Sequence, residues 1–569
     1  MTMNILVNLV FIAAICFTSV AVGAFILLRT FQISSNSAFL LGGGYFVGMS
    51  VFMSALRIIT SFTHNLKSGA IFSLCLLFVL TLPNFKHVKY LFMRAVDFKL
   101  RAILATICFL IFLYVFLIGL WFDQTGFHWS GSLHADRYAA ISDLFALLND
   151  IPVINQNSGQ AILSAIPSVF GYALPNFSLN MYLFVSVVAI AVLFFGLLRV
   201  YGASRKLAVM GSSIVMLGNC TLSLSHVLIL DSGSPWLFVG YFDSLEAIAT
   251  ALIFIVAASD PRSALNGRPL RWNTDVWPLL LPFCFGISSH QVGPQNLLIL
   301  LPILGLWFIL SFWKRFPLRL SLGRVVLPLI VGSSIGFFHG GMTTPRTFHT
   351  DLSKYKNEGT QKLMSMKSHS SSILLYPVMP YRFFDGAGWR AGKAKYLLNK
   401  FDVDYFIKTS KNPRSAQVIL WSLEEEIWTA ARIMFFPLLG ITLFWVHLRR
   451  RYFDQSAKKL NSPETFTDRT FLLHLFFAGI ASISLCLGFL VSFSVAIFGY
   501  KWELSRFSML GNTMGMLILI LAVDAHLSHL TDASKNRIFA FLCFLTMFGP
   551  LLNNTLLSLG NLSLLLARF

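Results

Sequence analysis

The strongest constraint on this chain is a series of long apolar runs that recurs from one end of the sequence to the other. Hydrophobic residues make up 56% of the 569 residues and charged residues only 12%, whereas a soluble domain carries roughly a quarter charged residues. A helix needs about 20 apolar residues to cross a bilayer. The sequence therefore predicts an all-α polytopic membrane protein and excludes an ordinary soluble enzyme.

The apolar runs predict about 14 transmembrane helices. The first run has no basic segment before it and is too long for the core of a signal peptide, so it is expected to be a retained span. The predicted spans are 5–28, 37–59, 67–83, 102–122, 180–199, 207–229, 244–258, 276–290, 295–313, 325–340, 431–448, 471–498, 507–527 and 537–553.

Basic residues gather in short stretches between the predicted spans. Loops of this kind face the cytoplasm in polytopic membrane proteins, and all of them fall on one face when the predicted spans alternate. The formal net charge of +20 is therefore explained by orientation in a membrane, and nucleic acid is not expected as a partner. The basic stretches are 84–101, 199–206, 259–275, 314–324 and 449–459.

The opposite face receives two long hydrophilic segments, a first outer loop at 122–179 and an insert at 343–430. The insert is too long for an ordinary connection and is expected to be a small folded domain or lid. We therefore predict a transmembrane domain at 1–342, this extracytoplasmic insert, and C-terminal transmembrane helices at 431–569. The charge pattern predicts that the outer loops face away from the cytoplasm. We expect the membrane to be a bacterial inner membrane, with these loops towards the periplasm or exterior.

The first outer loop is the one long acidic segment of the chain. It holds a single base, Arg137, and the acids Asp123, Asp136, Asp143 and Asp150. A carboxylate near a histidine, on an aqueous loop above the bilayer, suits a general base or a metal ligand. His134 and Asp136 would converge only from an irregular turn, which the preceding serines and glycine permit. Alternatively each aspartate caps a helix, because aspartate is a favoured N-cap residue.

A short amphipathic helix is expected in the same loop. Tyr138, Ile141, Phe145 and Leu148 recur at three- and four-residue spacing, which is typical of a helix with one apolar face. We expect such a helix to lie flat on the membrane surface rather than to cross it.

These features resemble the GT-C superfamily of integral-membrane glycosyltransferases, which use polyprenyl-phosphate-linked sugars. The resemblance rests on the run His134-Ala135-Asp136-Arg137-Tyr138, placed in an outer loop before an amphipathic helix. It implies an enzyme that moves a sugar from a polyprenyl-phosphate donor to a glycan, lipid or protein acceptor on the outer face. Asp136 would take the proton from the acceptor hydroxyl, and the sugar carbon would invert its configuration.

Residues 155–160 also look like the segment that GT-C proteins place before the next span. The chain departs from the family pattern because Asp136-Arg137 stands where members often carry two adjacent acids. A divalent cation is therefore left open as a cofactor, and no other cofactor is implied.

Further candidate substrate-binding residues lie near the predicted outer ends of other spans. Asp231, Asp243 and Glu246 surround a second outer loop, where they form either a solvated turn or a second acidic group facing the first loop. His290 closes a span and either lies at the interface or bonds a substrate hydroxyl or phosphate.

Two later outer segments carry the candidate cations. Arg382 and Arg390 flank an aromatic, glycine-rich stretch in the insert, which suits sugar stacking and phosphate pairing as well as an ordinary turn. Lys501 and Arg506 are either anchors at the membrane interface or ligands of a leaving phosphate. With His134, Arg137 and Tyr138, these residues complete the predicted binding set.

Two other functions compete with glycosyl transfer. One is a multi-pass transporter or a flippase of lipid-linked glycans, and the other is a polymerase or ligase of such glycans. Arg57 and Asp524 are the main charges inside predicted spans, and they outline no obvious transport pathway.

Overall fold

The computed structural model describes the first two thirds of the chain in segments, together with short pieces between 438 and 541. In these residues the backbone is helical, and its only extended pairing is an isolated bridge between Asn266 and Leu320. The longer described segments are 2–31, 36–82, 133–152, 159–200, 203–217, 242–260, 263–266, 272–292, 295–312 and 319–339.

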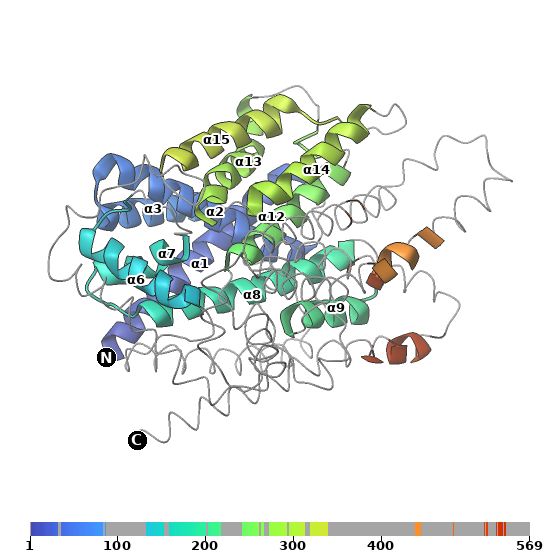
Figure 1. Cartoon of the computed structure of the whole chain (residues 1–569), viewed down its shortest axis with the longest axis horizontal. Coiled ribbons are helices and arrows are strands. Elements are labelled where there is room, and N and C mark those ends of the chain that lie inside the picture. Colours follow the sequence, from blue (N-terminus) through green and yellow to red (C-terminus); the bar gives the residue numbers. More distant parts are fainter. Residues whose placement is uncertain are drawn as a thin grey trace, which may run out of the picture. The chain divides into compact units, whose positions relative to one another are not determined.

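The named helices follow the order of the apolar runs (Figure 1). They are α1 (Thr2–Thr30), α2 (Ser37–Thr63), α3 (Leu66–Thr81), α6 (Leu133–Leu148), α7 (Gly159–Val169), α8 (Pro175–Val200), α9 (Arg205–Leu217), α12 (Phe242–Ser259), α13 (Trp272–Val292), α14 (Gln295–Phe312), the short π-helix η2 (Leu322–Val326) and α15 (Leu327–Phe338).

Three of these helices, α1, α2 and α8, are long and apolar enough to cross a membrane. Shorter apolar helices occupy the spans predicted near 67–83, 244–258, 276–290, 295–313 and 325–340. The helical class is thus confirmed over the described residues, with three candidate membrane spans. The span at 102–122, the insert at 343–430 and most of 431–569 lie outside the described residues, so the total of about 14 spans stays a prediction.

The chain divides into two compact units. One comprises Met1–Val200 and Trp236–Leu375, and holds every named helix except α9. The other comprises Tyr201–Pro235 and Tyr376–Phe569. The predicted domain boundaries near 342 and 430 lie outside the described residues, so they stay predictions.

Helix α2 is the centre of the first unit, because it packs on α1, α3, α8, α12 and α13 and is buried along most of its length. Glycines make this packing possible. A Cβ at Gly48 would overlap the backbone of Ser19 on α1, and a Cβ at Gly42 would overlap the backbone of Leu193 on α8. Small residues let helix backbones approach closely where lipid gives little hydrophobic drive for association.

Basic stretches that are far apart in sequence meet at one end of this unit. The Ala264 N–H donates to the Thr30 carbonyl over 2.9 Å, and the Arg324 guanidinium donates to the Ala264 carbonyl. Ala264 belongs to the basic stretch 259–275, and Arg324 to the basic stretch 314–324. The end of α1, the turn after α12 and the start of η2 therefore lie together, as the charge pattern predicts.

Candidate functional site

At the opposite end of α2, the residues that connect and begin α3 form hydrogen bonds with Asn149, the residue that follows α6. The Leu66 N–H donates to the Asn149 carbonyl over 2.6 Å, and the Lys67 N–H donates to the Asn149 Oδ1 over 2.9 Å. His64 and Asp150 form an ion pair at 3.7 Å. The first outer loop is therefore anchored to this end of the helices rather than to the end with the basic stretches.

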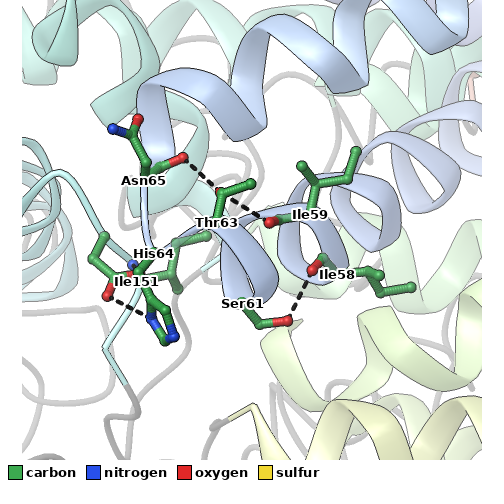
Figure 2. A network of polar contacts seen from close by, with 8 residues as sticks. Ile58, Ile59, Ser61, Thr63, His64, Asn65 and Ile151 are labelled. Atoms are coloured by element: carbon green, nitrogen blue, oxygen red, sulfur yellow. Dashed lines mark hydrogen bonds and ion pairs between the residues drawn. The ribbon is translucent and has the colours of Figure 1, made fainter.

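The connection between α2 and α3, His64 and Asn65, is flanked by local hydrogen bonds (Figure 2). The Thr63 hydroxyl donates to the Ile59 carbonyl over 2.9 Å, and the Asn65 side chain accepts the Ser68 N–H over 2.8 Å as the N-cap of α3. Between the two helices His64 adopts a left-handed backbone with φ of 47°. Only two residues, His64 and Asn65, thus separate α2 from α3, and the residue that follows α6 is hydrogen-bonded to this short connection.

The backbone of α6 corrects two hypotheses about the acidic loop. It is helical from Leu133 onward, so His134 and Asp136, two positions apart, fall on different faces of one helix. The irregular turn that would bring them together does not occur in 133–148. Asp136 is the fourth residue of α6 and not its N-cap, so capping does not explain that residue. Arg137 and Tyr138 follow within the same helix.

A helix is present where the sequence predicted one, and two of the four residues on its predicted apolar face are buried. Ile141 and Phe145 are buried, and α6 packs on α7 and α8 (Figure 1). Neighbouring helices of the same unit cover Ile141 and Phe145, so these two residues do not face lipid, whereas the expected orientation of the helix along the membrane surface stays a prediction.

The helix that covers it, α7, was not predicted, because 122–179 was interpreted as a hydrophilic loop. Its residues 161–166 are all buried, and it contacts α3, α6 and α8. The signal was present in the sequence as the apolar run Ala161–Ile166, which is too short to span a bilayer but long enough to fill a core. Its burial makes α6 and α7 part of the packed first unit.

Asp143 is the α6 acid whose surroundings the structure describes best. The carboxyl is half-buried, and this burial raises its pKa from 3.8 to about 6. Positions 136 and 143 are seven residues apart, which is about two helical turns, so they share one face of α6. A carboxyl that titrates near neutral pH suits proton transfer. The structure thus adds Asp143 to the candidate acid–base residues.

Exchange of Asp143 for asparagine is expected to stabilise the fold at neutral and alkaline pH. Because its folded pKa is about 6 and its ordinary value is 3.8, the carboxyl contributes stability below about pH 4 that is lost as the pH rises through 6. Asparagine stays neutral, so its advantage should be about 1–2 kcal/mol above pH 7 after allowance for partial exposure. Unfolding midpoints at about pH 4 and pH 8 measure this. An equal difference at both pH values would contradict a desolvated carboxyl.

His290 is the predicted binding residue whose side chain the structure does describe. It is buried near the end of α13, and its ring packs edge-on against Phe337 with 6.1 Å between centroids. Arg57, on α2, is close enough to act electrostatically on His290, and it donates to the His339 carbonyl over 2.9 Å. His290 is therefore part of a buried basic group rather than a residue at the interface.

Two acids of the second outer loop, Asp243 and Glu246, lie in a helix and not in the expected solvated turn. Glu246 is buried within α12, only 3% exposed, and accepts a hydrogen bond of 3.0 Å from the Ser50 hydroxyl. Asp243 lies in the first turn of the same helix. The remaining predicted site residues lie outside the described residues and stay predictions; they are Asp231, Arg382, Arg390, Lys501 and Arg506.

Among the described residues, no group of three or more histidine, cysteine, aspartate or glutamate side chains is placed to hold a metal ion. No protein-family model matches the chain, and neither the curated proteins nor the solved structures give a match. The resemblance to GT-C enzymes therefore rests on the residues of the first outer loop and on the arrangement of spans.

Proposed function

We propose that this chain is an integral-membrane glycosyltransferase that moves a sugar from a polyprenyl-phosphate donor to an acceptor hydroxyl. The observation that carries the proposal is the position of α6. This acidic helix, with carboxylates at 136 and 143, is anchored by Asn149 to the end of apolar helices that lies away from the basic stretches. A lipid-linked donor in the outer leaflet presents its sugar at that level of the membrane.

The chemistry follows from the needs of the reaction. An acceptor hydroxyl is a poor nucleophile until a base takes its proton, and Asp136 is proposed as that base. The hydroxyl oxygen then attacks the anomeric carbon, the bond from that carbon to the phosphate oxygen breaks, and the lipid phosphate leaves with inversion of the sugar. Asp143, about two helical turns further along α6, is the alternative candidate for the base.

The leaving phosphate needs fixed positive charge. Lys501 and Arg506 are proposed to supply it, because arginine offers a fork of donors to a phosphate. Arg382 and Arg390 are proposed to bind the sugar or its phosphate from the insert. His290, beside Arg57, is proposed to hold the substrate from the helix side. The proposed location is a bacterial inner membrane, with this site facing the periplasm.

The proposal is tested with the full chain purified into lipid nanodiscs. A panel of polyprenyl-phosphate sugars is expected to release free polyprenyl phosphate with an acceptor present, whereas the matching nucleotide sugars should release nothing. The assay counts lipid phosphate and glycosylated acceptor in the same sample. Release from nucleotide sugars instead would replace the donor class, and transport of the intact lipid-linked sugar across the bilayer without cleavage would favour a flippase.

A transporter is the second candidate, and one observation favours it. Ser50, Glu246 and Ser288 place polar groups deep between α2, α12 and α13, and buried ionisable residues within membrane helices often mark ion or substrate pathways.

A further inference from the structure

Two asparagines supply the hydrogen-bond acceptors at the start of α3. The first N–H groups of an α-helix have no partner within the helix. In α3 the third of them, on Ser68, donates to the Asn65 Oδ1 over 2.8 Å. Asn65 directly precedes the helix and is its N-cap. The N–H groups of Leu66 and Lys67 therefore need an acceptor from another part of the chain.

Asn149 accepts both of these groups. Its carbonyl accepts the Leu66 N–H over 2.6 Å, and its Oδ1 accepts the Lys67 N–H over 2.9 Å, across 82 positions of the sequence. Asn149 directly follows α6, and its own N–H donates to the Ala146 carbonyl over 3.3 Å. A single residue thus ends α6 and completes the first turn of α3.

The backbone of Asn149 shows why an asparagine suits this position. Its φ is 50°, in the left-handed region, which glycine adopts freely and asparagine or aspartate more readily than other residues with a side chain. The contact with Lys67 also requires a side-chain oxygen. Aspartate meets both requirements, glycine meets only the first, and alanine meets neither.

These two hydrogen bonds define where the end of α6 lies. The apolar packing of α6 on α7 and α8 is favourable but has no preferred direction, whereas each hydrogen bond requires a particular distance and angle. Asp143 stands six residues before Asn149, which is about 9 Å along the helix axis. A change in the attachment at Asn149 would therefore be passed along α6 to its carboxylates.

We propose that Asn149 is a positioning residue, which holds α6 against the start of α3 and thereby fixes the place of Asp136 and Asp143. The contact itself does not depend on what the protein does, but its effect on turnover rests on the proposed sugar transfer. A displacement of reacting groups by about 1 Å can slow a reaction about a hundredfold. The attachment of α6 is thus a requirement of the chemistry as well as of the fold.

The first test compares two variants of the full chain in nanodiscs. Asn149→Gly keeps the left-handed backbone and the carbonyl bond to Leu66, but it removes the acceptor of the Lys67 N–H. We expect its kcat for sugar transfer to fall about tenfold or more, with the KM for the lipid-linked donor unchanged. Asn149→Asp should recover most of the native kcat, because it keeps the oxygen and adds a negative charge that a helix N-terminus favours.

Asn36→Ala is the matched control for the loss of a helix cap. Asn36 is the N-cap of α2, where its Oδ1 accepts the N–H groups of Ala38 and Phe39 over 3.1 and 3.2 Å. It lies at the other end of α2 from the connection to α3. The control should lower the unfolding midpoint about as much as Asn149→Gly does and keep the native kcat. A parallel fall of kcat in both variants would assign Asn149 a structural role only and overturn the proposal.

The second test does not depend on activity and measures amide hydrogen exchange at Lys67. Exchange should be about five- to tenfold faster in Asn149→Gly, because a hydrogen bond of ordinary strength is lost, and native-like in Asn149→Asp and Asn36→Ala. Native-like exchange in Asn149→Gly would overturn the contact, and faster exchange with a native kcat would overturn the positioning role. A native chain that transfers no sugar would refute the proposed function, while the exchange rates would still decide whether Asn149 holds α6.

Discussion

Exchange of Asp136 for asparagine is expected to slow sugar transfer by about a hundredfold or more, because a positioned carboxylate contributes roughly 10²–10⁴-fold to such a reaction. Asparagine keeps the shape of the side chain but cannot take a proton. The variant should insert, fold and bind the lipid-linked donor as the native chain does. Single-turnover transfer with a saturating donor measures the chemical step separately from binding.

Asp150→Asn is the matched control for this experiment. Asp150 is another acid of the first outer loop, but the structure assigns it to the ion pair with His64, and an exposed pair of this kind contributes little. Its transfer rate should stay close to that of the native chain. A helix-dipole effect of Asp136 near the start of α6 would change stability by only about 0.3–1 kcal/mol. Native-like transfer by Asp136→Asn would exclude Asp136 as the base. Asp143, Asp231 and Asp243 would then be the remaining candidates for the base.

Gly48→Leu is expected to prevent the stable assembly of α1 on α2. A Cβ at Gly48 would already overlap the Ser19 backbone, and backbone cannot move aside as a flexible side chain can. Overpacking of a tight core typically costs about 1–3 kcal/mol and more where backbones collide. The expected result is a large loss of monodisperse protein after solubilisation, with a strongly lowered unfolding midpoint in the fraction that remains.

Gly305 provides the control, because nothing lies within 4 Å of a Cβ added at this position on α14. Gly305→Leu should leave yield and midpoint nearly unchanged, or raise them slightly through its better helix propensity. Gly48→Ala should fall between the two, since it adds the colliding atom but no further bulk. A Gly48→Leu protein as stable as the Gly305→Leu protein would contradict the close approach of α1 and α2.

The sequence by itself determined the helical class and the position of most described helices. In a bilayer a helix satisfies its own backbone hydrogen bonds, so a local apolar run such as 37–59 is sufficient to indicate α2. The spacing of Ile141 and Phe145 likewise indicated α6 before any partner was known. The charge pattern indicated which connections share an end, and the contact of Ala264 with Thr30 agrees with it.

Only the tertiary structure decided what covers each helix. The apolar face of α6 was assigned to lipid, whereas α7 and α8 cover it, because a periodic pattern shows that a face is apolar but not which apolar surface it meets. Glu246 was expected beside the second outer loop, in a solvated turn or an acidic group facing the first loop, yet its partner Ser50 is 196 residues away in the sequence. Such pairings depend on the three-dimensional order of the helices, which local composition does not encode. They fix the position of Glu246 and of the connection between α2 and α3 that contacts the end of α6.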